Sequence, residues 1–363
     1  MSVLGATLLA ALGFMVLIVL HELGHFAAAK AVGMQVDQFS LFFGPKIFRK
    51  RIGETEYAIG TIPAGGYVSI AGMNPNQELS DEARTRAYYS QPVWKRIVVI
   101  SAGPAMNFLI GFILFVVFFW LIGAVTEKPV VDSVQSGFPA HGVLQRGDRI
   151  VSVNGVHGSV DKLAPIVQGD KCAQSRQTDH CQAAHPVTVV VERHGQTLEL
   201  HMTPVYDAQN RISRLGFTWA TAHQRQAFGA AVSTAGDRFS SVTRVTAELP
   251  ARIFNTHQRK QIHGIVGSYE TTRQTILHDP GDTVGLLAVI SLALAVVNLF
   301  PFLPLDGGHI FWGLVELVRR RPVPFSTMER ASFVGFALVA MLFVIGFTND
   351  IGTLSNGGFQ PAR

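Results

Sequence analysis

Four long apolar stretches constrain the fold of this chain more than any other feature of its sequence. The first covers residues 2–20 without a charged side chain, and the others cover residues 97–125, 284–305 and 331–347. A helix of about 20 apolar residues can span the hydrocarbon core of a bilayer. Only 15% of all residues are charged, whereas soluble domains have about 25%. The chain is therefore expected to be a polytopic α-helical membrane protein with four spans, rather than a soluble enzyme or a disordered chain.

Two of these stretches have an alternative interpretation. The first resembles a signal peptide with Ala27–Ala29 as the cleavage site, but no Lys or Arg precedes Lys30, and signal peptides begin with basic residues. The fourth stretch is short for a span, so a buried helix of a soluble domain is its alternative. We expect both stretches to cross the membrane.

Basic residues are concentrated in two of the loops between the predicted spans. Between the first and second spans lie Lys30, Lys46, Arg49, Lys50, Arg51, Arg84, Arg86, Lys95 and Arg96, and between the third and fourth lie Arg319, Arg320, Arg321 and Arg330. Because Lys and Arg mark cytoplasmic loops, both termini and residues 126–282 are expected to be extracytoplasmic. The pattern fits a bacterial cytoplasmic (inner) membrane. The net charge of +5 and the absence of basic runs interleaved with aromatics argue against nucleic acid as a partner.

The cytoplasmic loop has strand-like segments over residues 35–43, 47–52, 56–62 and 66–70. Glycine-containing turn signals separate these segments, which is typical of short β-strands. Their apolar side chains predict a membrane-associated β-loop that could add an extended peptide as a further strand. An ordinary cytoplasmic β-hairpin domain is the alternative.

The extracytoplasmic insertion resembles a PDZ domain over residues 130–204. The likeness rests on Gly147-Asp148-Arg149-Ile150 followed by Val153-Asn154-Gly155, and it implies a PDZ-like α+β domain that binds peptides or screens access to the membrane part. A polar insertion over residues 169–185 makes the binding of a peptide carboxylate doubtful.

Two cysteines, Cys172 and Cys181, lie in this polar insertion on the expected oxidising side of the membrane. A local disulfide is the favoured interpretation, and free thiols or a zinc site with nearby histidines are alternatives. Apolar residues then recur at helical spacing over residues 228–253, which predicts an amphipathic helix on the outer membrane surface or against the PDZ-like domain.

The expected domain order follows from these segments. It is a first span at 1–31, a cytoplasmic β-rich loop at 32–95, a second span at 96–125, the PDZ-like domain at 126–205, an extracytoplasmic amphipathic linker at 206–282, a third span at 283–318, a fourth span at 331–348 and a tail at 349–363.

The motif His21-Glu22-Leu23-Gly24-His25 lies in the inner half of the first span. Two histidines four residues apart lie on one face of a helix and can bind one metal ion. The intervening Glu22 can take a proton from water beside that ion. Ionisable side chains inside a membrane cost about 2.5–3.5 kcal/mol each when unpaired. The position of this motif therefore predicts a metal ligand pair rather than a chance match.

A catalytic zinc usually has three protein ligands, and the third apolar stretch offers the missing one. Pro301 and Pro304 interrupt its helix, and Asp306 follows directly. Irregular backbone at membrane depth is tolerated where it is buried in protein or lines a wet cavity. Asp306 is therefore the predicted third ligand, with His309 as its rival and a simple helix-capping role as the alternative.

Together these motifs resemble the site-2 protease family of intramembrane zinc metalloproteases. The first span carries the two histidines and Glu22, and a later span carries Asn298, Pro301 and Leu305-Asp306-Gly307-Gly308. The single PDZ-like domain, Ser101-Ala102-Gly103-Pro104-Ala105-Met106-Asn107-Phe108 and Gly65-Gly66-Tyr67 narrow the likeness to the bacterial RseP-type group.

The resemblance implies a site and a substrate class. It assigns Zn²⁺ to His21, His25 and Asp306, the catalytic base to Glu22, and substrate contacts to Asn298, Gly65, Gly66, Tyr67 and Asn107. It implies regulated intramembrane proteolysis, within the lipid bilayer, of single-span proteins such as anti-sigma factors or signal-peptide remnants, after cleavage by an upstream site-1 protease. A PDZ-bearing membrane scaffold or receptor with an inert metal site is the alternative, against which the intact Glu22 argues.

Overall fold

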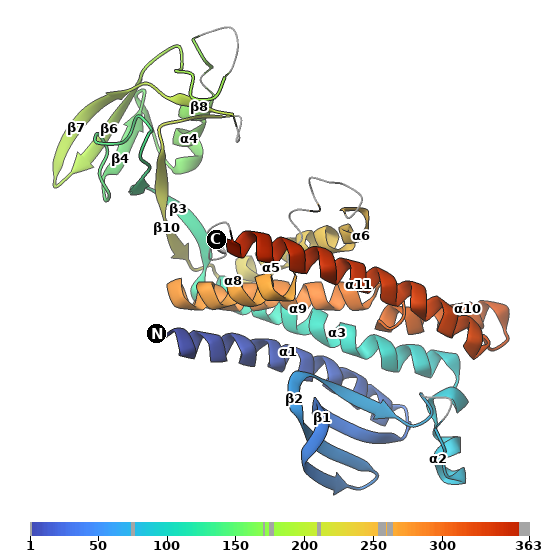
Figure 1. Ribbon diagram of the computed structural model, residues 1–363. Helices are drawn as coiled ribbons and strands as arrows, with labels where there is room; N and C mark the ends of the chain where they lie inside the picture. Colours follow the sequence, from blue (N-terminus) through green and yellow to red (C-terminus); the bar gives the residue numbers. More distant parts are fainter. Residues whose placement is uncertain are drawn as a thin grey trace. The chain divides into compact units, whose positions relative to one another are not determined.

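Three helices dominate the structure, a computed structural model that describes residues 2–73, 77–169, 171–173, 178–208, 212–252, 259 and 264–355. They are α1 (Val3–Ala31), α3 (Val93–Val117, continued by a π-helical turn at Phe118–Ile122) and α11 (Phe325–Ser355) (Figure 1). Within the described residues, these three are long and apolar enough to cross a membrane. They lie in the first of two units, 1–122 with 226–363; the second is 123–225.

The predicted third span is not one helix. The chain forms α9 (Asp282–Asn298), leaves helical conformation, and resumes as α10 (Asp306–Arg319). Pro301 and Pro304 have no amide hydrogen to donate, so a continuous helical ladder cannot form across them. The apolar α9 is only 17 residues long, and the count of four spans therefore stays a prediction.

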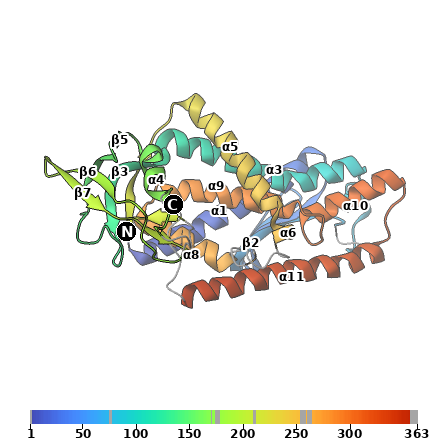
Figure 2. The same cartoon turned by 90° about the horizontal axis from the view of Figure 1, so that it is seen from above.

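Shorter helices lie between these long ones along the chain. They are α2 (Asp81–Thr85), a 3₁₀ turn at Tyr88–Ser90, α5 (Phe228–Ala247), α6 (Leu249–Arg252) and α8 (Ile265–His278). The helix α3 contacts α1, α9 and α5, and α5 crosses it in the view of Figure 2. The ring of Phe239 on α5 lies 5.6 Å from that of Phe108 and 6.0 Å from that of Phe112. Thus α5 is a helix, as expected, and one of its faces covers the apolar helices.

The predicted β-rich loop forms two long strands, β1 (Val36–Ile52) and β2 (Thr55–Ile70), each of which folds back on itself. Residues 38–41 lie between residues 56–59 on one side and residues 66–69 on the other. Residues 66–70 therefore form an edge that pairs with no further strand in the described part of the chain. The four short segments of the prediction correspond to the halves of these two strands.

The described residues of the second unit form a mostly antiparallel β-structure with one helix. Its main sheet has the order β10-β3-β4-β6-β7, with β5 paired to β4 and a separate β8–β9 pair. The elements are β3 (Ala124–Val134), β4 (Arg149–Val153), β5 (Val156–His157), α4 (Val160–Gln168), β6 (Val187–Arg193), β7 (Gln196–Met202), β8 (Val205–Asp207), β9 (Ile212–Arg214) and β10 (Phe217–Gln224). The α+β composition expected here is observed.

The predicted end of this domain at residue 205 is too early. Strand β10 pairs along β3, with Phe217 opposite Val134 and Gln224 opposite Ala124, and this closes the unit at Arg225. The pairing joins segments about 90 residues apart, which no local pattern reveals. Within the polar insertion, Cys172 and Cys181 form a disulfide with their Cα atoms 5.8 Å apart.

Candidate metal centre

The two histidines of the first helix point to one place. His21 and His25 lie one turn apart on α1, and their Nε2 atoms are 3.3 Å apart. Both side chains are buried, with 7% and 8% of their surface exposed. The i, i+4 spacing on an unbroken helix accounts for this convergence, because residues four apart share a face.

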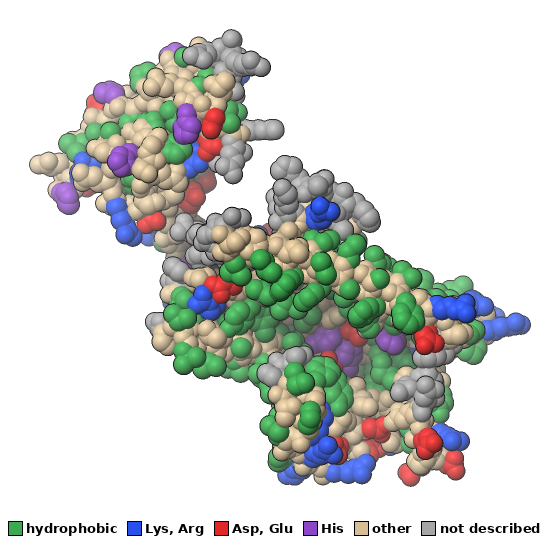
Figure 3. Space-filling view, viewed as in Figure 1, with side chains coloured by type: hydrophobic (Ala, Val, Ile, Leu, Met, Phe, Trp, Pro, Cys, Tyr) green, Lys and Arg blue, Asp and Glu red, His purple; other side chains and the backbone are tan. Residues whose placement is uncertain are grey.

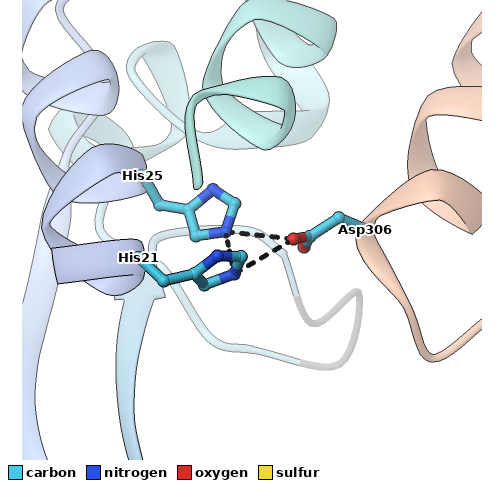
Figure 4. A group of neighbouring side chains, drawn as sticks. All are labelled: His21, His25 and Asp306. Carbon is cyan, nitrogen blue, oxygen red and sulfur yellow. Dashed lines mark hydrogen bonds and ion pairs between the residues drawn. The ribbon is translucent and has the colours of Figure 1, made fainter. Parts of the chain in front are cut away.

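Asp306 is the first residue of α10 and faces the same point (Figure 4). Its Oδ2 atom lies 3.2 Å from Nε2 of His21 and 3.3 Å from Nε2 of His25. The structure thus brings together three residues, of which the two furthest apart in the sequence, His21 and Asp306, are separated by 285 positions. His309, the rival ligand, is not in this group.

The three donor atoms have the spacing that a tetrahedral cation requires. Zinc binds imidazole nitrogen and carboxylate oxygen at about 2.0–2.2 Å, so two ligand atoms on one tetrahedral ion lie roughly 3.3–3.5 Å apart. Oδ2 of Asp306 lies 3.2 Å and 3.3 Å from the two Nε2 atoms, and the two Nε2 atoms are 3.3 Å apart. Two imidazoles and one carboxylate are also the donor set of many catalytic zinc sites. These residues therefore fit a zinc ion.

Close packing between α1 and α3 sets the positions of the histidine rings. A Cβ atom at Gly24 would lie 2.4 Å from the backbone oxygen of Ala102, and one at Gly103 would lie 2.2 Å from Nε2 of His25. Neither distance is possible for a real side chain, so both glycines are required for this packing. Sequence reasoning missed both roles, because they depend on which helices are neighbours.

Each histidine also has a partner on α3 behind the site. Nδ1 of His25 donates to the backbone oxygen of Val99 at 2.9 Å, since a carbonyl only accepts. This bond leaves Nε2 of His25 with its lone pair directed at the other donors. Nδ1 of His21 lies 3.2 Å from the side-chain amide of Asn107.

Glycines also permit the tight turn that delivers Asp306. A Cβ atom at Gly307 would lie 2.2 Å from the backbone oxygen of Leu299, and one at Gly308 would lie 2.5 Å from the backbone nitrogen of Leu303. The start of α10 therefore packs directly on the irregular backbone that precedes it. This contact explains why two glycines follow the aspartate.

A cleft of about 390 Å³ opens beside the three donor atoms. Figure 3 shows histidine side chains at the base of a recess bordered by apolar side chains. Glu22 lines this cleft with both histidines and Asp306. A Cβ atom at Gly66 would lie 3.6 Å from Cγ of Glu22, so the β2 edge comes close to this carboxylate.

Four of the five expected substrate-contact residues line the cleft. Asn298 contributes from the end of α9, and Gly65, Gly66 and Tyr67 contribute from β2. Asn107 is different, because it is fully buried on α3 and is not part of the cleft wall. The structure places Asn107 against His21 instead.

Comparison with known proteins agrees with this geometry. The model of peptidase family M50 matches residues 9–342. The chain belongs to peptidase family M50. As a member of this family it is a site-2-type metalloprotease and a multi-pass membrane protein.

Curated relatives match this M50 peptidase along nearly its whole length. "Putative zinc metalloprotease Cj1068" from Campylobacter jejuni is 28% identical, over 93% of this chain and 91% of the relative. "Putative zinc metalloprotease BR1156/BS1330_I1152" from Brucella suis is 30% identical, over 93% and 92%. "Zinc metalloprotease Rip1" from Mycobacterium tuberculosis is 28% identical, over 94% and 96%. The names of these relatives support zinc as the cofactor of this M50 peptidase.

A solved structure also matches part of the chain. The PDZ domain of the SdrC-like protein from Listeria monocytogenes covers 26% of this chain and 88% of its own, with 17% identity and a TM-score of 0.21. A score this low carries no argument about the fold, so the PDZ-like nature of the second unit rests on its sequence pattern.

Proposed function

We propose that this M50 peptidase hydrolyses peptide bonds within the transmembrane segments of single-span membrane proteins. The observation that carries the proposal is the convergence of two imidazoles and one carboxylate, with Glu22 beside them, in a cleft walled by apolar helices and by the edge of β2. His21, His25 and Asp306 would hold zinc. When bound, zinc supplies a Lewis acid that activates water at neutral pH and polarises the scissile carbonyl.

Glu22 is the proposed catalytic base. Its carboxylate accepts one proton from water as the water oxygen adds to the scissile carbonyl carbon. It then gives that proton to the amide nitrogen as the C–N bond breaks, so the amine leaves neutral and Glu22 returns to its starting state. Glu22 is half-buried where it lines the cleft, beside the three donor atoms.

The outer edge of β2 is the proposed docking site for substrate. A transmembrane helix hides its carbonyl groups in its own hydrogen bonds, so it must unwind before cleavage. In the described chain residues 66–70 pair only with β1. Four of them, Gly66, Tyr67, Val68 and Ile70, line the cleft. An added strand would give the extended substrate backbone its hydrogen bonds at the site. Asn298 and Gly65, Gly66 and Tyr67 would contact this strand.

The wider biological setting is also part of the proposal. The basic loops support a topology with both termini and the PDZ-like unit outside the cytoplasm, in a bacterial inner membrane crossed four times. Substrates would be anti-sigma-like proteins or signal-peptide remnants, trimmed first by a site-1 protease, in regulated intramembrane proteolysis. The PDZ-like unit would screen access to the membrane part.

The test is the variant Glu22→Gln in the full-length protein, reconstituted in lipid with a single-span substrate. We expect zinc content to stay at the wild-type level while cleavage falls by about 10³-fold or more, because the variant keeps the shape but loses the base. A chelator should abolish wild-type cleavage and added zinc should restore it. Cleavage by Glu22→Gln at a rate close to wild type would contradict the assignment.

A further inference from the structure

The side chain of Asn107 lies behind the metal centre rather than in the cleft. Asn107 is fully buried on α3, with 0% of its surface exposed. Its side-chain amide lies 3.2 Å from Nδ1 of His21. On its other side, the hydroxyl of Ser291 on α9 donates to the Asn107 backbone oxygen at 2.9 Å. This bond joins α9 to the backbone of α3 at the residue whose side chain lies against His21.

The orientation of the Asn107 side-chain amide decides which ring nitrogen of His21 carries the proton. The nitrogen and oxygen of an Asn side chain exchange places on a 180° rotation, and hydrogen-bond chemistry has to assign them. As drawn, the NH₂ group faces Nδ1 of His21, which requires the ring proton to be on Nε2. A proton on Nε2 would block that nitrogen from binding a cation. The opposite orientation turns the amide oxygen to Nδ1, so that Nδ1 carries the proton and Nε2 is free.

Two observations favour the second orientation. As drawn, the Asn107 side-chain oxygen is buried and has no hydrogen-bond partner among the described residues, and the rotation would give it the ring N–H of His21 as a donor. The neighbouring ring is already held in this way, because Nδ1 of His25 donates to the backbone oxygen of Val99 at 2.9 Å. Both Nε2 atoms would then present lone pairs toward one point, where Oδ2 of Asp306 also lies.

We infer that Asn107 is a positioning residue: its side-chain oxygen accepts the Nδ1–H bond of His21 and holds that ring with Nε2 free to bind zinc. The inference rests on the proposed function. It separates Asn107 from Asn298, which lines the cleft and is the substrate-facing asparagine. An amide provides this acceptor without adding another charge to the apolar interior.

The test compares zinc dissociation constants of full-length variants in detergent, measured by competition with a chelator. Asn107→Leu keeps the size but removes the acceptor, and we expect zinc binding about 10–100-fold weaker, as for other outer partners of metal-bound histidine. Asn107→Asp keeps an acceptor oxygen and removes the NH₂ donor, so it should bind zinc within a few-fold of wild type or more tightly. Asn298→Leu is the matched control, with wild-type zinc affinity but reduced cleavage.

The outcomes separate the inference from the proposed function. Wild-type zinc affinity in Asn107→Leu would overturn the inference, and so would equal losses in Asn107→Leu and Asn107→Asp, because that pattern requires the NH₂ donor. If Asn107→Leu does not fold, judged by gel filtration and thermal unfolding, Asn107→Asp decides alone: retention of zinc supports the inference, and its loss refutes it. Absence of zinc binding in wild type and Asn298→Leu would instead remove the proposed function itself.

Discussion

The two sides of the metal centre are built by different means. On one side, His21 and His25 stand on an unbroken helix, and α3 packs so closely that Gly24 and Gly103 must lack side chains. On the other side, Asp306 starts a helix that follows seven residues of irregular backbone, 299–305. Two ligands therefore depend on regular helix packing, whereas the third depends on the path of one loop.

An ion pair joins the two sides away from the donor atoms. Nη2 of Arg96 on α3 lies 2.7 Å from Oε1 of Glu316 on α10, with side chains only 17% and 20% exposed. The helix that supports both histidines is thereby tied to the helix that carries Asp306. The third wall of the cleft, the β1–β2 sheet, packs on α1 through apolar side chains, and Glu54 at its turn pairs with Lys30 of α1.

The largest effect is expected from an added methyl group on the helical side. Gly103→Ala would place Cβ 2.2 Å from Nε2 of His25, so we expect at least a 100-fold loss of both zinc affinity and cleavage. Gly308→Ala clashes with backbone at 2.5 Å, but the irregular segment can shift, and we expect a smaller loss. For both variants, chelator competition gives the zinc affinity, and cleavage of a single-span substrate in lipid gives the activity.

A control and a contrary result define this comparison. Gly236 on α5 has no atom within 4 Å of an added Cβ, so Gly236→Ala should keep wild-type values. If Gly308→Ala is more damaging than Gly103→Ala, the loop rather than the helix pair is the rigid side of the centre.

A middle-sized effect is expected from the link between the two sides. Arg96→Gln or Glu316→Gln alone should lower the free energy of unfolding by about 1–3 kcal/mol, between the values for exposed and buried pairs. Zinc affinity should fall in parallel. The swap of Arg96→Glu with Glu316→Arg should recover part of both losses in thermal unfolding and chelator competition. If the double variant loses as much stability as Arg96→Glu alone and Glu316→Arg alone added together, the pair does not couple the helices.

The smallest effect is expected at the β-loop. The carboxylate of Glu54 lies 2.6 Å from Arg86 and 2.6 Å from Lys30, and hydrogen bonds from Arg86 first and Lys30 second lower the pKa of Glu54 below its ordinary 4.5. A lowered pKa stabilises the fold above pH 4.5, and this stabilisation is lost as pH falls through the pKa of the folded state.

Glu54→Gln tests that pH dependence. At pH 7 the variant should be less stable than wild type by at most about 1 kcal/mol, as for partly exposed ion pairs. Unfolding curves recorded from pH 7 down to pH 3 should show this gap closing below pH 4.5. A gap that stays constant over this range would mean that packing, and not charge, holds the turn.

The parts of this structure that sequence predicts are those encoded locally. The helix that carries His21 and His25 follows from an apolar run and a four-residue spacing. The break before Asp306 follows from Pro301 and Pro304, because proline cannot continue a helical ladder. Asp306 is preferred over His309 because it follows this break directly, whereas His309 lies three residues further along the chain.

The parts that sequence did not predict depend on neighbours in space. Gly103 matters because the ring of His25 lies over it, and a glycine in an apolar run carries no sign of that contact. Asn107 was expected to meet substrate, yet it lies against His21. Strand β10 was missed because its partner β3 lies far away in the sequence.

Zinc K-edge X-ray absorption on the full-length Glu22→Gln protein tests the central claim most directly, because this variant should hold the metal without turnover. The account predicts one zinc per chain, with nitrogen and oxygen ligands at about 2.0–2.2 Å and an imidazole pattern from two histidines. The zinc signal should be lost in the double variant that combines Asp306→Ala with His21→Ala. Zinc bound through sulfur, or an unchanged spectrum in that double variant, would contradict the account.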